Sequence, residues 1–211
     1  MARRTPTQAR ATRTRAALVD AARDEFAASG YAGTTARSIA VRAGAATGSF
    51  YQYFDDKDEI LREICQQRLE DVGEQARRIF HFEVEPNGDA VGNVNRKRLA
   101  QVVQLVMDLH ASNPNLHRVI TEREHADARL REMTGKTMGD LATNIAEMLR
   151  HWGYDGDVQA RAFLICMLVE GAVHAHVLGE AVVSDRRFKK DLVAALESLI
   201  GPPPTLNSKS N

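Results

Sequence analysis

Residues 34–54 combine small side chains with a tight turn in a way that few folds accommodate. A short helix is predicted through Ala43, with Thr34 or Thr35 as its N-cap. A break follows, and residues 46–54 predict a second short helix. Two helices can cross closely only where their residues are small, and small residues stand at the expected crossing, namely Ala40, Ala43, Gly44 and Ala45. The segment therefore predicts a helix-turn-helix.

The second helix of this motif pairs apolar anchors with short residues at its start. The expected anchors of the motif are Ile39, Phe50 and Phe54. The short residues are Ala46, Thr47, Gly48 and Ser49. They would let the helix N-terminus approach DNA in the major groove, where it also favours phosphate.

Charge is distributed unevenly along the chain. The 211 residues include 28 basic and 28 acidic side chains, yet residues 1–54 hold eight arginines and only three acids. A basic N-terminal part on an acidic body suits a protein that meets a polyanion. Alternatively, five of these eight arginines belong to a solvated tail. Charge alone does not decide between the two.

The rest of the chain predicts an all-α fold, because apolar residues recur at helical spacing and no segment alternates as a strand does. Residues 1–11 are expected to be a disordered basic arm, and 202–211 a disordered tail. A first helix should end at Gly30, and Asp56 with Glu59 should form a capping box for the fourth. Further helices are expected over residues 95–111, 115–150 with a break near Gly135, 157–178 and 185–200.

Residues 12–62 resemble the DNA-binding domain of the tetracycline-repressor (TetR) family. The resemblance is carried, without a gap, by Thr14, Arg15, Ala21, Ala22, Phe26, Gly30, Tyr31, Thr34, Thr35, Ile39, Ala40, Ala43, Gly44, Tyr51, Gln52, Tyr53, Phe54, Lys57, Ile60 and Leu61. It implies a three-helix DNA-binding domain over 12–58 and an α-helical effector-binding and dimerisation domain over 59–201. Two departures are Ala45, where the family often has Val, and the acidic pair Asp55–Asp56 near the expected phosphate path.

The resemblance also implies roles for single residues in DNA binding. Thr35 would cap its helix and touch a phosphate, and Arg37 would reach the backbone or a groove edge. The bases would be faced by the start of the second helix, that is Ala46, Thr47, Gly48, Ser49 and Gln52. Tyr51 and Lys57 would hold phosphates, and Tyr53 would do so or pack between helices. Tyr51 and Phe54 could instead be core aromatics, which is the interpretation we favour for Phe54 only.

The same resemblance implies a homodimer and an unknown small-molecule effector. Small or apolar residues of the last two helices are the candidates for the dimer interface: Gly171, Ala175, Phe188, Leu192, Leu196 and Leu199. Packing within one chain is the alternative. Candidate effector contacts are Met107, His110, Trp152, Phe163, Met167, Glu170 and His174. An acid and a histidine on an apolar helix face could bind a ligand, or could pair with each other.

Several other functions find no support in the sequence. His174 and His176 are the only close histidine pair, and their spacing points them to different helix faces, so no metal is expected. Catalytic and cofactor motifs are absent, and two distant cysteines suit a reduced, cytoplasmic protein without a membrane partner. The favoured hypothesis is a dimeric repressor that binds a palindromic, double-stranded operator and is released by a partly apolar effector. The alternatives are a helical protein-interaction scaffold or an enzyme without a recognised motif.

Overall fold

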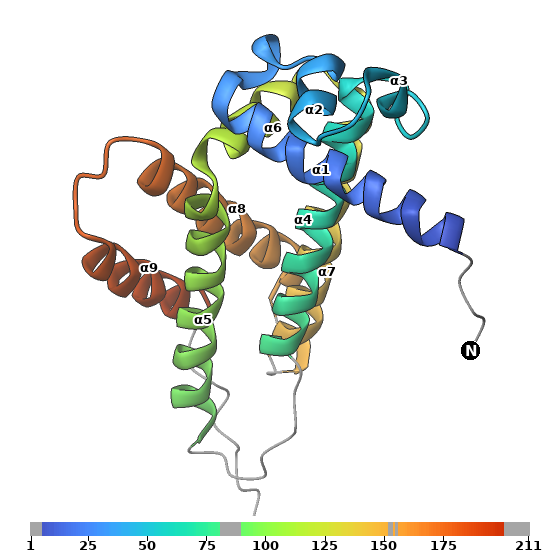
Figure 1. Cartoon of the computed structure of the whole chain (residues 1–211). Helices are drawn as coiled ribbons and strands as arrows, with labels where there is room; N and C mark the ends of the chain where they lie inside the picture. Colours follow the sequence, from blue (N-terminus) through green and yellow to red (C-terminus); the bar gives the residue numbers. More distant parts are fainter. Residues whose placement is uncertain (1–5, 81–89, 152–153, 155, 201–211) are drawn as a thin grey trace, which may run out of the picture. The chain divides into compact units, whose positions relative to one another are not determined.

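The computed structural model describes residues 6–80, 90–151, 154 and 156–200, and over these residues the chain forms nine α-helices and no strand (Figure 1). This confirms the all-α prediction. The helices are α1 Pro6–Gly33, α2 Ala36–Arg42, α3 Thr47–Phe50, α4 Lys57–Phe80, α5 Ala90–Ser112, α6 Pro114–Glu124, α7 Ala128–His151, α8 Val158–Leu178 and α9 Asp185–Ile200. The predicted disordered tail over 202–211 lies outside the described residues, as do Trp152 and the first five residues of the predicted arm.

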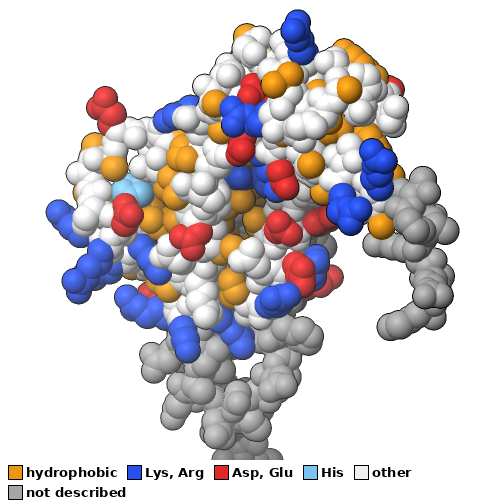
Figure 2. All heavy atoms as spheres, in the orientation of Figure 1, with side chains coloured by type: hydrophobic (Ala, Val, Ile, Leu, Met, Phe, Trp, Pro, Cys, Tyr) orange, Lys and Arg blue, Asp and Glu red, His pale blue; other side chains and the backbone are white. Residues whose placement is uncertain are grey.

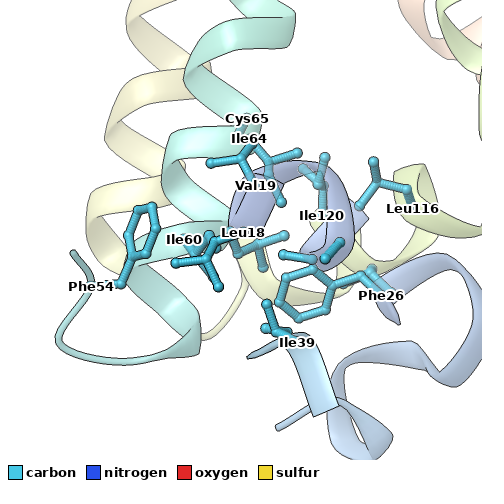
Figure 3. Packing of buried hydrophobic residues seen from close by; sticks show 14 of the residues in the cluster. Leu18, Val19, Phe26, Ile39, Phe54, Ile60, Ile64, Cys65, Leu116 and Ile120 are labelled. Carbon is cyan, nitrogen blue, oxygen red and sulfur yellow. The ribbon is translucent and has the colours of Figure 1, made fainter. Parts of the chain in front are cut away.

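The chain divides into two compact units. The N-terminal unit comprises residues 1–70 and 113–133, and the C-terminal unit comprises 71–112 and 134–211. This differs from the predicted boundary at residue 58, because the start of α4, all of α6 and the start of α7 belong to the N-terminal unit. The reason is burial: four residues of α6 and α7 share the core of α1, namely Leu116, Val119, Ile120 and Leu130. Figure 3 shows Leu116 and Ile120 among them.

The core of the N-terminal unit is built on the apolar stripe of α1. Leu18, Ala22 and Phe26 are fully buried, as their helical spacing predicts. They pack with Ile39 of α2 and Ile60 of α4 (Figure 3). Gly30 interrupts the helix with a φ of 66°, a left-handed conformation that side chains with a Cβ rarely adopt.

The first helix begins earlier than predicted. It starts at Pro6, so residues 6–11 are helical, and the prediction of a disordered arm is wrong for them. Proline is favoured in the first turn of a helix, where its missing N–H is not needed. The following residues include Ala9, Arg10 and Ala11, which have high helix propensity.

The break between α6 and α7 also differs from the prediction. Gly135 lies inside α7, and the helices separate at residues 125–127 instead. Asp127 causes this break because its Oδ1 accepts hydrogen bonds from the backbone N–H groups of Arg129 (3.0 Å) and Leu130 (3.2 Å). It caps the new helix as an N-terminal aspartate does.

In the C-terminal unit, α5, α8 and α9 pack against one another (Figure 1). Asp157 caps α8, as the predicted start requires, by accepting from the N–H groups of Gln159 and Ala160. A second apolar core joins α5, α7, α8 and α9, with Val103, Leu149 and Val173 fully buried.

Candidate functional site

The first helix of the motif, α2, is held at both ends by local hydrogen bonds. Thr35 is its N-cap, and its Oγ1 accepts from the N–H of Ser38 at 3.0 Å while Ser38 Oγ accepts from the N–H of Thr35 at 3.0 Å. The turn that follows places Gly44 at a φ of 65°, which favours glycine. The N–H of Ala45 donates to Ala40 O at 2.9 Å and closes the turn. The predicted helix-turn-helix is therefore present.

The second helix of the motif, α3, has one buried side and one exposed side. Phe50 is fully buried and Phe54 is 2% exposed, so the core role favoured for Phe54 is confirmed. Seven candidate DNA contacts are exposed: Thr35 and Arg37 at the first helix, and Ala46, Thr47, Gly48, Tyr51 and Gln52 in the second segment. Ser49 and Tyr53 are half-buried, and Tyr53 packs against the core. Helix α3 ends at Phe50, earlier than the predicted residue 54, and turns continue the segment.

No neighbour in the fold accounts for the glycine at position 48. A Cβ built there meets no other atom within 4 Å. Glycine weakens a helix by about 1 kcal/mol relative to alanine. Among the described residues, no contact therefore requires a glycine at this position.

The predicted capping box at the start of α4 is only half formed. Asp56 Oδ1 accepts from the N–H of Glu59 at 2.7 Å, as expected. The Glu59 carboxylate accepts from the N–H of Asp55, rather than from that of Asp56. Asp55 and Asp56 thus take part in hydrogen bonds that stabilise the start of α4.

Lys57 has structural partners that the sequence did not reveal. Its Nζ donates to the backbone oxygens of Tyr31 (2.8 Å) and Thr34 (3.0 Å), and it lies 4.0 Å from the centre of the Tyr31 ring. Two of its three N–H groups therefore stabilise the chain itself. A phosphate could take only the third.

A half-buried polar cluster beside Lys57 was missed because its members are far apart in sequence. Tyr31 donates to Asp58 Oδ1 at 2.7 Å, and Arg123 of α6 lies 3.1 Å from the same oxygen. Burial and the hydrogen bond to Asp58 raise the pKa of Tyr31 to about 12. These contacts tie α1, α4 and α6 together behind the motif.

Several of the N-terminal arginines are engaged within the unit. Arg15 pairs with Glu63 at 2.8 Å, and Arg42 pairs with Glu25 at 2.5 Å. The hydrogen bond from Arg15 holds the pKa of Glu63 below its usual value. Arg10 and Arg13 remain exposed on α1. Counting the basic residues in the sequence therefore overestimates the positive charge that the N-terminal unit can present to a polyanion.

The C-terminal unit encloses a small apolar cavity. Its volume is about 60 Å³, and its walls come from α5, α7, α8 and α9. The lining includes Val106, Ile145, Cys166, Val169, Glu170 and Leu196. Burial raises the pKa of the Cys166 thiol to about 11, so this wall is neutral apart from Glu170.

The predicted effector contacts do not all come together at this cavity. Of the six candidates that the structure describes, Glu170 alone belongs to its lining. Phe163 and Met167 instead face outward from the unit, with 54% and 40% of their surface exposed. His110 is fully buried beside Glu170, and Met107 is buried in the core. The helical spacing showed which residues share a face of α8. It did not show whether that face points out of the unit or toward the cavity.

The predicted dimer residues separate into two groups. Leu192 and Leu196 are 6% and 1% exposed and lie in the core of their own unit, which is the alternative of packing within one chain. Phe188 stacks on His176, with ring centres 4.0 Å apart, and Leu199 packs against the same core. Gly171 and Ala175, by contrast, are exposed on α8.

The outer side of α8 is apolar, and this distinguishes it from α9. Phe163, Leu164 and Met167 are exposed along it. On the face shown in Figure 2, Lys and Arg side chains lie along α9. By length and composition α8 could cross a membrane, and only 33% of its apolar window is buried within the chain. A single helix of this kind is weak evidence for a membrane span, because a core or interface helix passes the same test.

Comparison with known proteins gives a consistent result. Residues 18–64 match the model of the bacterial regulatory proteins of the tetR family. A TetR-family transcriptional regulator from Mesorhizobium loti has a similar structure, with a TM-score of 0.73 and 18% identity over 90% of this chain and 96% of that one. A transcriptional regulator from Rhodococcus sp. Rha1 follows with a TM-score of 0.70 and 21% identity, over 88% and 95% of the two chains.

A third solved structure carries a more specific name. The fatty acid degradation regulator FadR from Bacillus halodurans has a TM-score of 0.68 and 18% identity, over 92% of this chain and 96% of that one. No curated protein matches the chain. The N-terminal residues 18–64 with their helix-turn-helix therefore form a DNA-binding domain of the tetR family type, and the chain shares the all-helical fold of these regulators.

Proposed function

We propose that the chain is a dimeric repressor that binds a palindromic operator and is released by a small, partly apolar effector. The observation that carries the DNA-binding part is the exposed start of α3. Ala46, Thr47 and Gly48 are small and exposed, whereas Phe50 and Phe54 of the same segment are buried. A recognition helix needs this combination, because its N-terminal residues must reach base edges.

Gly48→Ala tests this role against a purely structural one. Alanine fits without a clash and should raise helix stability by roughly 0.5–1 kcal/mol. If α3 enters the groove, the added methyl group should nevertheless lower operator affinity. A gel shift with DNA from beside the chain's own gene, against random competitor DNA, measures this. A variant that is more stable and binds equally well would place the DNA contact elsewhere.

We infer that the dimer forms through the outer side of α8. Phe163, Leu164 and Met167 would otherwise leave an apolar stripe in water. Gly171 continues the stripe, and a Cβ there meets nothing within 4 Å in the chain. Its missing side chain therefore suits the close approach of a second copy. A dimer would present two recognition helices about 34–36 Å apart, one turn of DNA.

Gly171→Leu should weaken the dimer without disturbing the fold, because the added side chain projects from an exposed position. The matched control is Ala194→Leu, which adds bulk to an exposed position of α9. Analytical ultracentrifugation should show monomers for the first variant only. A dimeric Gly171→Leu protein that keeps full operator affinity would rule out this interface.

The effector would enter the apolar cavity of the C-terminal unit. Pockets for small molecules usually hold about 300–1,000 Å³, far more than the cavity of about 60 Å³. Binding therefore has to displace the helices that line it. Because α4 and α7 each run from one unit into the other, such a displacement could change how the two recognition helices are presented.

The apolar lining with one carboxylate suits a ligand that is mostly hydrocarbon. One solved structure with the same fold is named a fatty acid degradation regulator, so fatty acyl compounds are a reasonable first library. Linkage requires that an effector which releases DNA is itself bound more weakly when DNA is present. Titration with and without operator tests this, and equal ligand affinity in both would exclude release by that ligand.

A further inference from the structure

Three metal-binding side chains meet in the C-terminal unit, although they come from two different helices. His110 lies on α5, and Glu170 and His174 lie one turn apart on α8. Each offers one donor atom, and these atoms all lie within 4.8 Å of one another. The rings of His110 and His174 meet edge to face with their centres 5.8 Å apart.

The hydrogen bonds of His110 determine which of its nitrogens can bind a cation. Its Nδ1 lies 2.9 Å from the backbone oxygen of Val106, which can only accept, so Nδ1 carries the proton. In the neutral ring Nε2 then offers a lone pair. That nitrogen lies 3.1 Å from Glu170 Oε1, which is also an acceptor when ionised. Something positive is needed between the two atoms, either a proton or a metal ion.

The surroundings favour a metal ion. A histidine that binds a metal usually donates its other ring N–H to a carbonyl or carboxylate, as His110 does to Val106. A nitrogen of His174 also lies within 4.8 Å of the donor atoms of His110 and Glu170, so a metal ion there would have three donors within reach. In a tetrahedral site with bonds of about 2.0–2.1 Å, the donors are roughly 3.3 Å apart. The existing separation of 3.1 Å is close to this value.

We propose that His110 Nε2, a ring nitrogen of His174 and the Glu170 carboxylate bind one divalent transition-metal ion. Two imidazoles and a carboxylate suit zinc, nickel or cobalt rather than magnesium or calcium, which prefer oxygen alone. Three protein donors leave a tetrahedral ion one further coordination position. The sequence pattern did not reveal this site, because its histidines lie on different helices and the only close pair, His174 and His176, faces two ways.

The location of the site suggests what the metal does. Glu170 and Val106 also line the cavity, so the ion would lie at its wall and join α5 to α8. Metal occupancy would then stiffen the helices that an effector has to displace. This regulatory role depends on the proposed function, but metal binding itself does not.

Titration of the tag-free, full-length protein with Zn²⁺, Ni²⁺ and Co²⁺ after removal of metals with a chelator tests the proposal. We expect one ion per chain by calorimetry, a higher melting temperature, and a cobalt absorption spectrum typical of tetrahedral nitrogen and oxygen ligands. Glu170→Gln and His174→Ala should each weaken binding by at least 100-fold. Both residues are only half-buried, so both variants should fold, as far-ultraviolet circular dichroism will verify.

The control is His125→Ala, which removes an exposed histidine from the N-terminal unit and should leave the affinity unchanged. Two results would overturn the proposal. One is a folded wild-type protein that binds none of the three ions at 100-fold excess. The other is binding that survives both Glu170→Gln and His174→Ala with undiminished affinity. In either case His110 and Glu170 form an ordinary ion pair.

Discussion

The two units of this chain are held together in different ways. In the N-terminal unit, charged and polar contacts join helices distant in sequence, such as Arg62 to Asp127 at 2.7 Å and Arg123 to Asp58 at 3.1 Å. The C-terminal unit also has such contacts, for example Arg96 to Glu197 at 3.2 Å, but it differs in having an apolar cavity between its helices and an exposed apolar helix face. A unit that positions a recognition helix benefits from directional contacts, whereas the proposed binding of a second copy and an effector would benefit from surfaces that can repack.

The largest effect should come from a charge in the core of the C-terminal unit. Leu196→Asp buries a carboxylate without a partner and should cost about 3–5 kcal/mol of the free energy of unfolding. Met167→Asp, on the exposed face of α8, should leave the fold intact and only dissociate the dimer. Denaturant unfolding and sedimentation separate the two outcomes. A stable, monomeric Leu196→Asp protein would return this residue to the dimer interface.

Next in size is the loss of a directional contact in the N-terminal unit. Asp127→Asn keeps the cap of α7 but removes the charge opposite Arg62, so we expect a loss of roughly 1–3 kcal/mol. The matched change Asp140→Asn, in an exposed i,i+4 pair of the C-terminal unit, should cost under about 0.5 kcal/mol. If both variants lost the same free energy of unfolding, charged contacts would contribute equally to the two units.

The same substitution should alter the response to acid. Burial would raise the pKa of Asp127, but hydrogen bonds from the Leu130 backbone and Arg62 outweigh it and lower the pKa. The stability that Asp127 contributes is therefore present above its ordinary pKa of about 3.9 and is lost as the pH falls below it. Melting temperatures between pH 3 and pH 7 should fall less steeply for Asp127→Asn. Parallel curves would contradict this assignment.

A smaller effect is expected at the surface of the motif. Tyr51 is 59% exposed, so Tyr51→Phe should weaken operator binding a few-fold on all sequences without changing stability.

Lys57→Ala should instead lower the melting temperature, because it removes the donor to Tyr31 O and Thr34 O. The plot of the logarithm of the binding constant against the logarithm of the salt concentration should also become less steep, by roughly 1, if the third N–H contacts a phosphate. A Lys57→Ala protein with unchanged melting temperature would show that the structural contacts contribute little.

The smallest effect concerns the two buried thiols. Burial raises the pKa of Cys65 and that of Cys166 to about 11, so both should react slowly with a thiol reagent at pH 8. Cys166 lines the cavity, and we expect it to react faster than Cys65, which lies in the N-terminal core. The single variants Cys65→Ser and Cys166→Ser identify each rate. Faster reaction of Cys65 would show that the N-terminal unit opens more readily.

The sequence by itself determined the local structure. Thr35 and Asp157 mark the starts of α2 and α8, Gly44 marks the turn, and the stripe of Leu18 and Phe26 marks the buried side of α1. These features depend on neighbours within about one helical turn, which the sequence displays directly. They were enough to predict an all-α chain with a helix-turn-helix.

Only the tertiary structure decided which surfaces meet. An apolar stripe such as Leu192 and Leu196 is the same in sequence whether its own chain or a second copy covers it, and the structure places it inside. In the same way, the apolar face of α8 was visible in the sequence, but its exposure was not. His110 and Glu170 became neighbours only through the packing of α5 on α8. Hydrophobic burial is non-directional, so it specifies that a face is covered but not what covers it.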